Sequence, residues 1–169
     1  MAIKFVVITI SDRSYYGVRE DQSGPSLCKL IENQKWILID RLIIPDDFEI
    51  IRETLMATCN NNEVDIVLTT GGTGVSPKDV TPEATLSVIE KIAPGLGEAM
   101  REKSLSITPH AMLSRAIAGI LHNKLVINLP GSPKAAEENF LTILPVLPHA
   151  VELLQDLPSS ENGHILNNV

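Results

Sequence analysis

The sequence predicts an α/β protein of the three-layer αβα kind, in which a doubly wound, mostly parallel sheet lies between two layers of helices. Short apolar runs rich in β-branched residues, such as IKFVVITI at residues 3–10 and KLVINL at residues 124–129, have the pattern of strands covered on both faces. These runs alternate with segments of helical periodicity, and the connections are short, which is typical of parallel strands joined by crossover helices.

Each element of this fold is predicted from a local pattern. Pro25 favours a helix start, because the first turn of a helix does not use the N–H group that proline lacks. Phe48, Ile51 and Leu55 share one face of a second helix. No element is assigned within residues 107–123. In chain order, we expect strands at residues 3–10, 36–44, 64–70 and 124–129, and helices at residues 23–34, 45–59, 81–91, 96–106 and 133–154, the last interrupted near Pro145 and Pro148.

The composition limits the classes of function. The 169 residues suit one domain, which we expect over residues 1–156, followed by a flexible tail over residues 157–169. A formal net charge of −7 with 14 basic residues argues against a nucleic-acid partner. Two isolated cysteines and four scattered histidines indicate no disulfide framework and no nucleophilic triad, and no apolar run suits a membrane span. We therefore expect a cytoplasmic protein without a membrane partner.

The stretch LTTGGTGVSPKDVTP over residues 68–82 is the most informative part of the sequence. Its glycines permit positive φ angles and a close approach of backbone N–H groups to an anion, although a plain turn has a similar composition. The usual nucleotide motifs are absent, because no P-loop spacing occurs and Pro77 stands where a dinucleotide fingerprint needs glycine. Polar loops follow four predicted strands and should meet at the sheet edge where such folds bind ligands, which favours a phosphate site. These loops are Ser11-Asp12-Arg13, Pro45-Asp46-Asp47, Gly71 to Asp79 and Pro130 to Lys134.

Four charged residues refine this hypothesis. Lys78 and Lys134 lie near predicted helix starts, where a cation is mildly unfavourable unless an anion lies between them, but both could simply extend into solvent. A carboxylate such as Asp79 would repel a phosphate unless a cation intervened, so Asp79 implies Mg²⁺. Asp46 could join the site, or it could be a helix N-cap.

Taken together, six loops closely resemble the molybdenum-cofactor biosynthesis family, and the likeness extends from the first strand to about Leu154. The string TTGGTG followed by DVTPEAT makes it much more specific than a single glycine motif. The loops that carry the resemblance are SDR at 11–13, IPDD at 44–47, TTGGTG with KDVTPEA at 69–84, PGLGE at 94–98, LSR at 113–115 and NLPGSPK at 128–134.

The resemblance implies a trimeric enzyme that uses Mg-ATP to transfer AMP onto the terminal phosphate of molybdopterin, with release of pyrophosphate and possible hand-over to a molybdenum-insertion protein. It implies that Asp46 and Asp79 form the catalytic, metal-binding pair. It places the nucleotide at Gly71, Gly72, Thr73, Gly74, Lys78, Pro130, Gly131, Ser132 and Lys134, and molybdopterin near Ser11, Asp12, Arg13, Ser104, Ser114 and Arg115. Many relatives carry arginine where this chain has Lys78, which offers a point charge in place of a bidentate fork. A non-catalytic molybdopterin carrier and a molybdenum-insertion relative remain alternatives.

Overall fold

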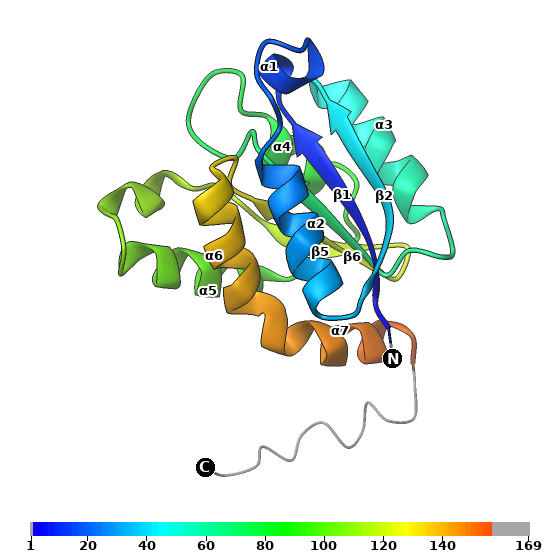
Figure 1. Ribbon diagram of the computed structural model, residues 1–169. Helices are drawn as coiled ribbons and strands as arrows, with labels where there is room; N and C mark the ends of the chain where they lie inside the picture. The colour runs from blue at the N-terminus through cyan, green and yellow to red at the C-terminus, as the bar shows by residue number, and fades with distance from the viewer. Residues whose placement is uncertain (1, 157–169) are drawn as a thin grey trace.

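The computed structural model describes residues 2–156, and the predicted tail lies outside them. Six strands form one sheet in the order β2-β1-β3-β6-β5-β4. The first four strands in this order are parallel, and β5 and β4 add an antiparallel edge. The predicted mostly parallel sheet is therefore confirmed (Figure 1). The strands are β1 (Lys4–Ile10), β2 (Ile37–Ile44), β3 (Ile66–Thr70), β4 (Lys91–Ile92), β5 (Ala118–Leu121) and β6 (Lys124–Leu129).

Helices cover both faces of the sheet. On one face, Leu27 of α2 and Phe140 of α6 pack into a core with Phe5 of β1. On the other face, Leu55 of α3 packs against Val67 of β3. The three layers are thus as predicted, and within residues 2–156 no helix is long and apolar enough to cross a membrane. The helices are α1 (Asp12–Tyr15), α2 (Ser23–Asn33), α3 (Phe48–Cys59), α4 (Thr81–Leu86), α5 (Pro94–Leu105), α6 (Pro133–Ile143) and α7 (Leu147–Leu154), with 3₁₀ turns η1 (Pro109–Leu113) and η2 (Leu144–Val146).

The antiparallel edge corrects the predicted pattern of elements. The helix expected over residues 81–91 ends at Leu86, because the chain beyond it pairs with β5 through the hydrogen bond from Glu90 N–H to the Ile120 carbonyl. β5 and β6 form a hairpin whose turn residues, His122 and Asn123, have φ angles of 50° and 59°. Two positive φ angles are typical of a type I′ turn, but His-Asn is not the usual sequence for one, so the hairpin was not predicted.

The strand order places four loops at one edge of the sheet. The chain first adds β2 on one side of β1 and later adds β3 on the other, so the switch point of the fold lies between β1 and β3. The loops there are joined directly: Ser11 N–H donates to the Ile44 carbonyl (2.9 Å), and Gly71 N–H donates to the Leu129 carbonyl (3.1 Å). The meeting of these loops is therefore confirmed.

Candidate active site

Residues 71–74, called here the glycine loop, have a shape that only glycine permits at two positions. The φ angles of Gly71 and Gly72 are 110° and 64°. A Cβ atom on Gly71 would lie 2.2 Å from the Ile10 carbonyl oxygen, and one on Gly72 would lie 2.3 Å from Oγ1 of Thr81. The first residue of α4 holds this shape, because Thr81 Oγ1 donates to the Gly71 carbonyl (2.9 Å) and Thr81 N–H to the Gly72 carbonyl (3.2 Å). The strained start of the loop is thus anchored to α4.

The glycine loop leaves a row of hydrogen-bond donors unused. Among the described residues, the N–H groups of Gly72, Thr73 and Gly74 find no acceptor. Gly131 lies against the same loop, because a Cβ atom on it would be 3.2 Å from Gly71 Cα. Gly131 leads into α6, whose N-cap Ser132 makes no side-chain cap. Free N–H groups beside a helix N-terminus are suited to binding an anion.

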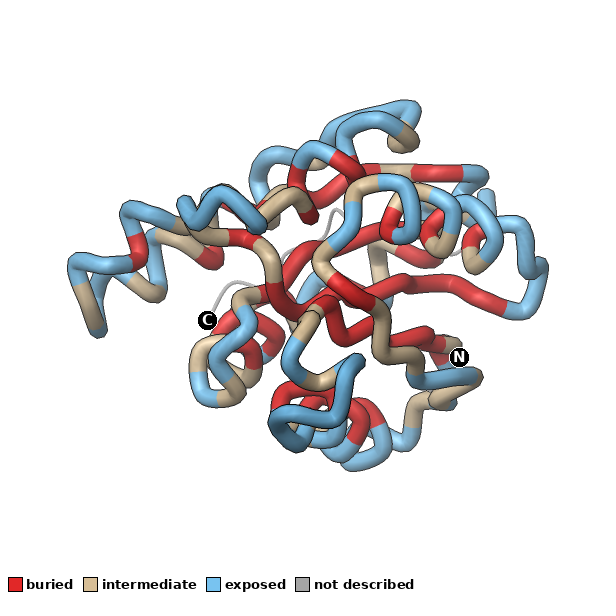
Figure 2. The backbone as a smooth tube through the Cα atoms, turned by 90° about the horizontal axis from the view of Figure 1, so that it is seen from above, coloured by how far each residue is buried: buried red, intermediate tan, exposed pale blue. Residues whose placement is uncertain are grey.

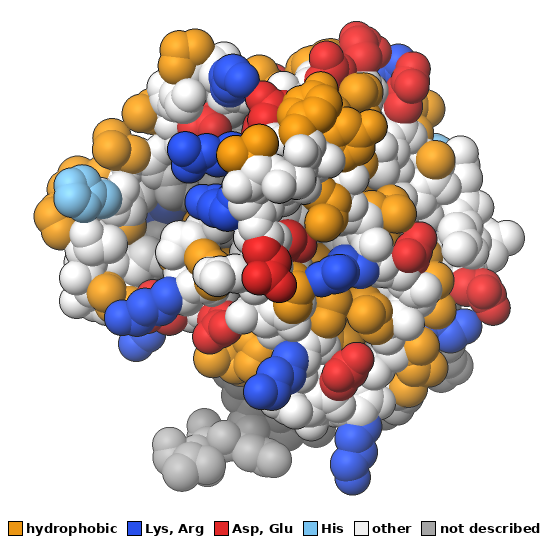
Figure 3. Space-filling view, turned by 45° about the horizontal axis from the view of Figure 1, so that its top comes forward, with side chains coloured by type: hydrophobic (Ala, Val, Ile, Leu, Met, Phe, Trp, Pro, Cys, Tyr) orange, Lys and Arg blue, Asp and Glu red, His pale blue; other side chains and the backbone are white. Residues whose placement is uncertain are grey.

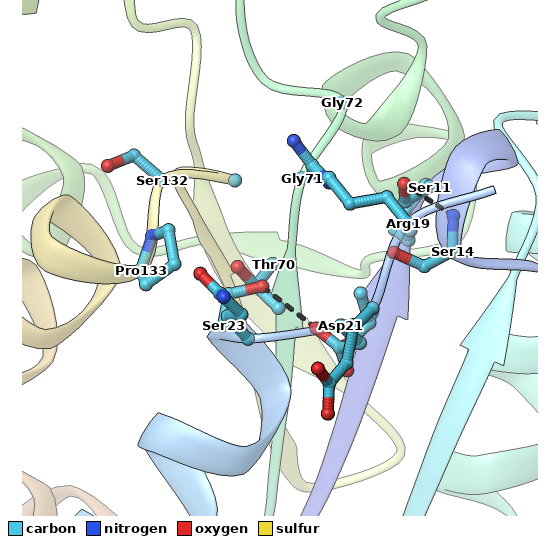
Figure 4. Close-up of a pocket in the computed structure, with 15 residues that line it drawn as sticks. Ser11, Ser14, Arg19, Asp21, Ser23, Thr70, Gly71, Gly72, Ser132 and Pro133 are labelled. Carbon is cyan, nitrogen blue, oxygen red and sulfur yellow. Dashed lines mark hydrogen bonds between the residues drawn. The ribbon is translucent and has the colours of Figure 1, made fainter. Parts of the chain in front are cut away.

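Two cavities meet at these donors. The first has a volume of about 600 Å³ and the second about 450 Å³, and Gly72, Gly131 and Ser132 line both. Hydroxyl groups dominate the first cavity, from Ser11, Ser14, Ser23 and Thr70 (Figure 4). A ligand in each cavity would therefore meet the other at the shared glycines.

A nearly buried carboxylate forms one wall of the first cavity. Asp21 accepts hydrogen bonds from Thr9 Oγ1 (2.8 Å) and from the N–H group of Gly24 (3.1 Å), at the start of α2. A Cβ atom on Gly24 would lie 2.5 Å from this carboxylate, so any other residue there would displace the Asp21 side chain. Asp21 was not predicted as a site residue, although an aspartate just before a helix that begins with serine is a capping signal.

The second cavity is more apolar and lies beneath a projecting arm made of α5 and η1, which extends to the left in Figure 2. Met100 and Leu113 supply apolar walls, and Ser104 and Ser114 supply hydroxyl groups. Arg101 brings a positive charge into this cavity, with its guanidinium anchored to the Ala116 carbonyl (2.7 Å). Neither Met100 nor Arg101 was predicted as a site residue.

Carboxylates gather beside the glycine loop. Asp12 and Asp46 bond reciprocally: Asp12 N–H donates to Asp46 Oδ2 (2.8 Å), and Asp46 N–H donates to Asp12 Oδ1 (3.1 Å). The Lys78 ammonium lies 2.7 Å from Asp12 Oδ2. Figure 3 shows acidic and basic side chains mixed over this end of the molecule. The cap of α3 is Asp47, which accepts from Ile50 N–H (3.0 Å), so the alternative role of Asp46 as the N-cap is wrong.

These contacts set the ionisation of the group. Burial raises the pKa of Asp46; the hydrogen bond from Asp12 N–H opposes this shift, and the charges of Asp12 and Asp79 reinforce it. The hydrogen bond from Lys78 lowers the pKa of Asp12. The Asp46 carboxylate thus lies in a partly desolvated place among like charges, where a cation would be favourable.

Asp46 and Asp79 lie at opposite ends of the glycine loop. A Cβ atom on Gly72 would be 3.3 Å from Asp46 Oδ1, and one on Gly74 would be 2.8 Å from Asp79 Oδ2. Residues 2–156 contain no group of three or more His, Cys, Asp or Glu side chains that could hold a metal ion alone. A pair of carboxylates beside an anion site suits Mg²⁺, which is commonly held by one or two carboxylates together with substrate phosphates and water.

The residues predicted for the nucleotide are mostly brought together. The glycine loop and the Pro130–Ser132 turn line the cavities, but Lys78 and Lys134 line neither. Lys78 pairs with Asp12, and the Lys134 side chain is 81% exposed and lies 3.9 Å from Glu138.

The residues predicted for molybdopterin are divided. Ser11 lines the first cavity, whereas Ser104 and Ser114 line the second. Asp12, Arg13 and Arg115 line neither cavity. The resemblance to the family did not predict this division between two cavities, because the division depends on how the arm folds over the glycine loop.

Comparisons with known proteins show the family of this chain. A family model described as a probable molybdopterin binding domain matches residues 6–149. The chain is 40% identical over 153 residues to a molybdopterin adenylyltransferase of Helicobacter pylori, covering 88% of this chain and 85% of that protein. It is 42% identical over 164 residues to gephyrin of Dictyostelium discoideum, covering 91% of this chain but only 23% of that protein. The chain is also 44% identical over 156 residues to the molybdenum cofactor synthesis protein cinnamon of Drosophila melanogaster. That match covers 92% of this chain but only 26% of that protein, so the chain spans about a quarter of the length of these two relatives.

Solved structures share the whole fold. The molybdopterin biosynthesis enzyme MoaB from Thermus thermophilus superimposes with a TM-score of 0.86 at 37% identity, covering 92% of this chain and 98% of that one. The Mog protein from Mycobacterium ulcerans gives a TM-score of 0.84 at 31% identity, covering 92% and 99% of the two chains. The order and arrangement of the strands and helices are therefore shared with these proteins.

Proposed function

The chain belongs to the family of molybdopterin-binding domains of molybdenum cofactor biosynthesis, and on this premise we propose that it is a molybdopterin adenylyltransferase. In this reaction AMP passes from Mg-ATP to the terminal phosphate of molybdopterin, and pyrophosphate is released. The observation that carries the proposal is the pair of cavities that share Gly72, Gly131 and Ser132. A transfer between two substrates needs both held at one point, and both cavity volumes suit small-molecule ligands.

We assign one substrate to each cavity. The larger, hydroxyl-rich cavity suits the ribose and phosphates of ATP, because Ser11, Ser14 and Ser23 offer hydrogen-bond partners to hydroxyl groups. The smaller cavity suits the flat pterin ring system, because Met100 and Leu113 offer apolar contact around a few polar groups. The phosphates of both substrates would then reach the free N–H groups of the glycine loop.

The chemistry needs positioning and charge stabilisation rather than a general base. A phosphate monoester has a second pKa near 6, so the acceptor is largely dianionic at neutral pH and is already a nucleophile. Its oxygen forms a bond to the α-phosphorus of ATP while the bond from that phosphorus to the bridging oxygen breaks, and the electron pair leaves with pyrophosphate. The N–H groups of Gly72, Thr73 and Gly74 can stabilise the charge on the phosphoryl oxygens. Asp46 and Asp79 would hold Mg²⁺, which when bound neutralises charge on the leaving pyrophosphate.

The direct test is to incubate the purified protein with molybdopterin, ATP and Mg²⁺ and to follow pyrophosphate and the adenylylated pterin by mass. Matched formation of both products supports the proposal. Asp79→Asn should keep the fold and lose most of the transfer. Pterin that stays bound with ATP intact, in a folded preparation, would favour a non-catalytic carrier.

Assembly and hand-over are part of the same proposal. We propose a homotrimer, supported by the apolar side chains that the projecting arm exposes: Leu105 is 45% exposed, Ile107 50% and Met112 70%. An activated, adenylylated product is suited to consumption by a molybdenum-insertion protein. Sedimentation measurements at several protein concentrations would test the trimer.

A further inference from the structure

Arg115 is the residue through which the end of the arm contacts the glycine loop. Its backbone N–H donates to the Thr73 carbonyl (2.9 Å). Its guanidinium makes three more contacts: Nε donates to the Gly74 carbonyl (2.6 Å), Nη2 donates to the Asp79 carbonyl (2.6 Å), and Nη1 pairs with the carboxylate of Glu83. One side chain therefore joins both ends of the segment at residues 75–78 to the first turns of α4.

The segment that Arg115 holds has few other restraints. Residues 75–78 are exposed, and Val75 is 63% exposed. Within the segment, Ser76 N–H donates to Asp79 Oδ2 (2.9 Å), and Asp79 N–H donates to the Ser76 carbonyl (2.9 Å). These bonds close the segment on itself. The exposed Lys78 ammonium pairs with Asp12 (2.7 Å), and Arg115 joins the two ends of the segment, at Gly74 and Asp79, to the end of the arm.

We infer that Arg115 is a positioning residue for the proposed transfer, which holds the Asp79 carboxylate and the N–H groups of the glycine loop in place without touching either substrate. This inference deepens the proposed function and rests on it. Its neighbours Ser114 and Ala116 line the second cavity, but Arg115 lines neither cavity. Three of its five guanidinium N–H groups already bond to protein oxygens, which leaves it less suited to bind the pterin phosphate.

Arginine is required for these contacts because of its shape. A guanidinium is a planar group with five N–H donors in fixed directions, so it reaches two carbonyl oxygens and a carboxylate at once. A lysine ammonium is a single point at the end of a flexible stem and would keep the charge but only part of the contacts. Arg115→Lys therefore separates the geometry of the group from its charge.

The test compares Arg115→Lys and Arg115→Gln with a matched control. Arg52→Lys is the control, because Arg52 is similarly exposed (34% against 36%) and also pairs with a glutamate, Glu49 at 2.8 Å, but lies on α3 outside both cavities. Glu83→Gln removes only the charged partner and should lose less activity than Arg115→Lys. The measurements are kcat, the pterin Kd by calorimetry, the Mg²⁺ concentration for half-maximal rate, the melting temperature and hydrogen exchange of residues 72–80.

For Arg115→Lys we expect kcat to fall by up to about 100-fold, the loss that a displacement of about 1 Å can cause. The half-maximal Mg²⁺ concentration should rise, the pterin Kd should change less than about two-fold, and exchange of residues 72–80 should accelerate. A merely structural role would lower the melting temperature without changing the Mg²⁺ requirement of the folded enzyme. If Arg115→Gln does not fold, the lysine variant decides.

Two results would overturn the inference. A pterin Kd weakened ten-fold or more, with kcat unchanged at saturation, would mean that Arg115 binds the pterin directly. Unchanged kcat and unchanged exchange in Arg115→Lys would mean that it positions nothing. If the unsubstituted protein makes no adenylylated pterin, the proposed function fails. The exchange rates then decide separately whether Arg115 holds the loop, and unchanged rates would refute that part as well.

Discussion

Asp46 and Asp47 are adjacent aspartates with different roles, and substituting each in turn separates activity from stability. Asp47 caps α3 by accepting from Ile50 N–H, whereas Asp46 faces the glycine loop and bonds to Asp12 N–H. We predict that Asp47→Ala lowers the free energy of unfolding by about 1 kcal/mol and leaves most of the AMP transfer. For a domain of this size that corresponds to a fall in Tm of about 2–4 °C.

Asp46→Asn should instead keep the stability and lose the AMP transfer. Asparagine keeps an oxygen that can accept from Asp12 N–H, but it removes a partly buried charge that lies near Asp12 and Asp79. Folding raises the pKa of Asp46, so its ionised carboxylate costs folding free energy above the folded-state pKa. That cost disappears below the unfolded-state pKa, because the carboxyl group is then protonated in both states. We therefore expect Asp46→Asn to melt no lower than the parent protein at pH 7, and any gain in Tm to shrink as the pH falls below the folded pKa and to vanish below the unfolded pKa.

Two measurements check both variants. Thermal melts between pH 3 and pH 8 report stability, and the assay of pyrophosphate and adenylylated pterin reports AMP transfer. Asp46→Asn should lose most AMP transfer while remaining folded, because a neutral amide is a weaker Mg²⁺ ligand than a carboxylate. Near-normal turnover in Asp46→Asn, or loss of turnover in Asp47→Ala, would refute the assignment of the two aspartates. A large fall in Tm for Asp46→Asn would show that its role is structural.

The remaining predictions concern the glycine loop and the two cavities. Gly71→Ala should destabilise by about 2–4 kcal/mol, because it combines a positive φ with a backbone clash, whereas Gly95→Ala, which meets nothing within 4 Å, should be nearly neutral in urea unfolding. Ser14→Trp should weaken ATP binding at least ten-fold in calorimetry and spare pterin, and Ala135→Trp should do the reverse, because each residue lines one cavity only. The opposite pattern would mean that ATP binds in the second cavity and the pterin in the first.

The sheet and its ligand edge could be predicted because their signals are local. β-branched runs mark the parallel strands, and a loop at the end of each strand must lie at the same edge whatever the details of packing. The one-residue difference between Asp46 and Asp47 could not be predicted in this way. Both are good N-caps, and the choice depends on how Phe48 and Ile51 meet the core at the start of α3.

The cavities could not be predicted, because they depend on contacts between segments far apart in sequence. Ser104 reaches the second cavity on the arm, where its hydroxyl donates to Asn139 of α6, 35 residues away (3.0 Å). Lys78 was expected to face an anion, but its nearest acidic group, Asp12, lies 66 residues earlier in the chain. Both positions follow from tertiary packing and leave no periodic or compositional signal.

The hydrogen bonds of the glycine loop explain why its free donors remain available. The carbonyls of Gly71 and Gly72 accept from Thr81, and those of Thr73 and Gly74 accept from Arg115. Every carbonyl of the loop is therefore used on the protein side, and the N–H groups of residues 72–74 are left for a ligand.

Thr81 is itself held from inside the fold. Its carbonyl accepts from Thr85 Oγ1 (2.8 Å), which in turn accepts from the buried Asn128 amide of β6 (3.0 Å). Asn128 lies within an apolar strand run, and its amide also donates to Thr69 Oγ1 (3.0 Å). The glycine loop is therefore held in one shape from inside the fold, and such preorganisation is what charge stabilisation in a transfer reaction requires.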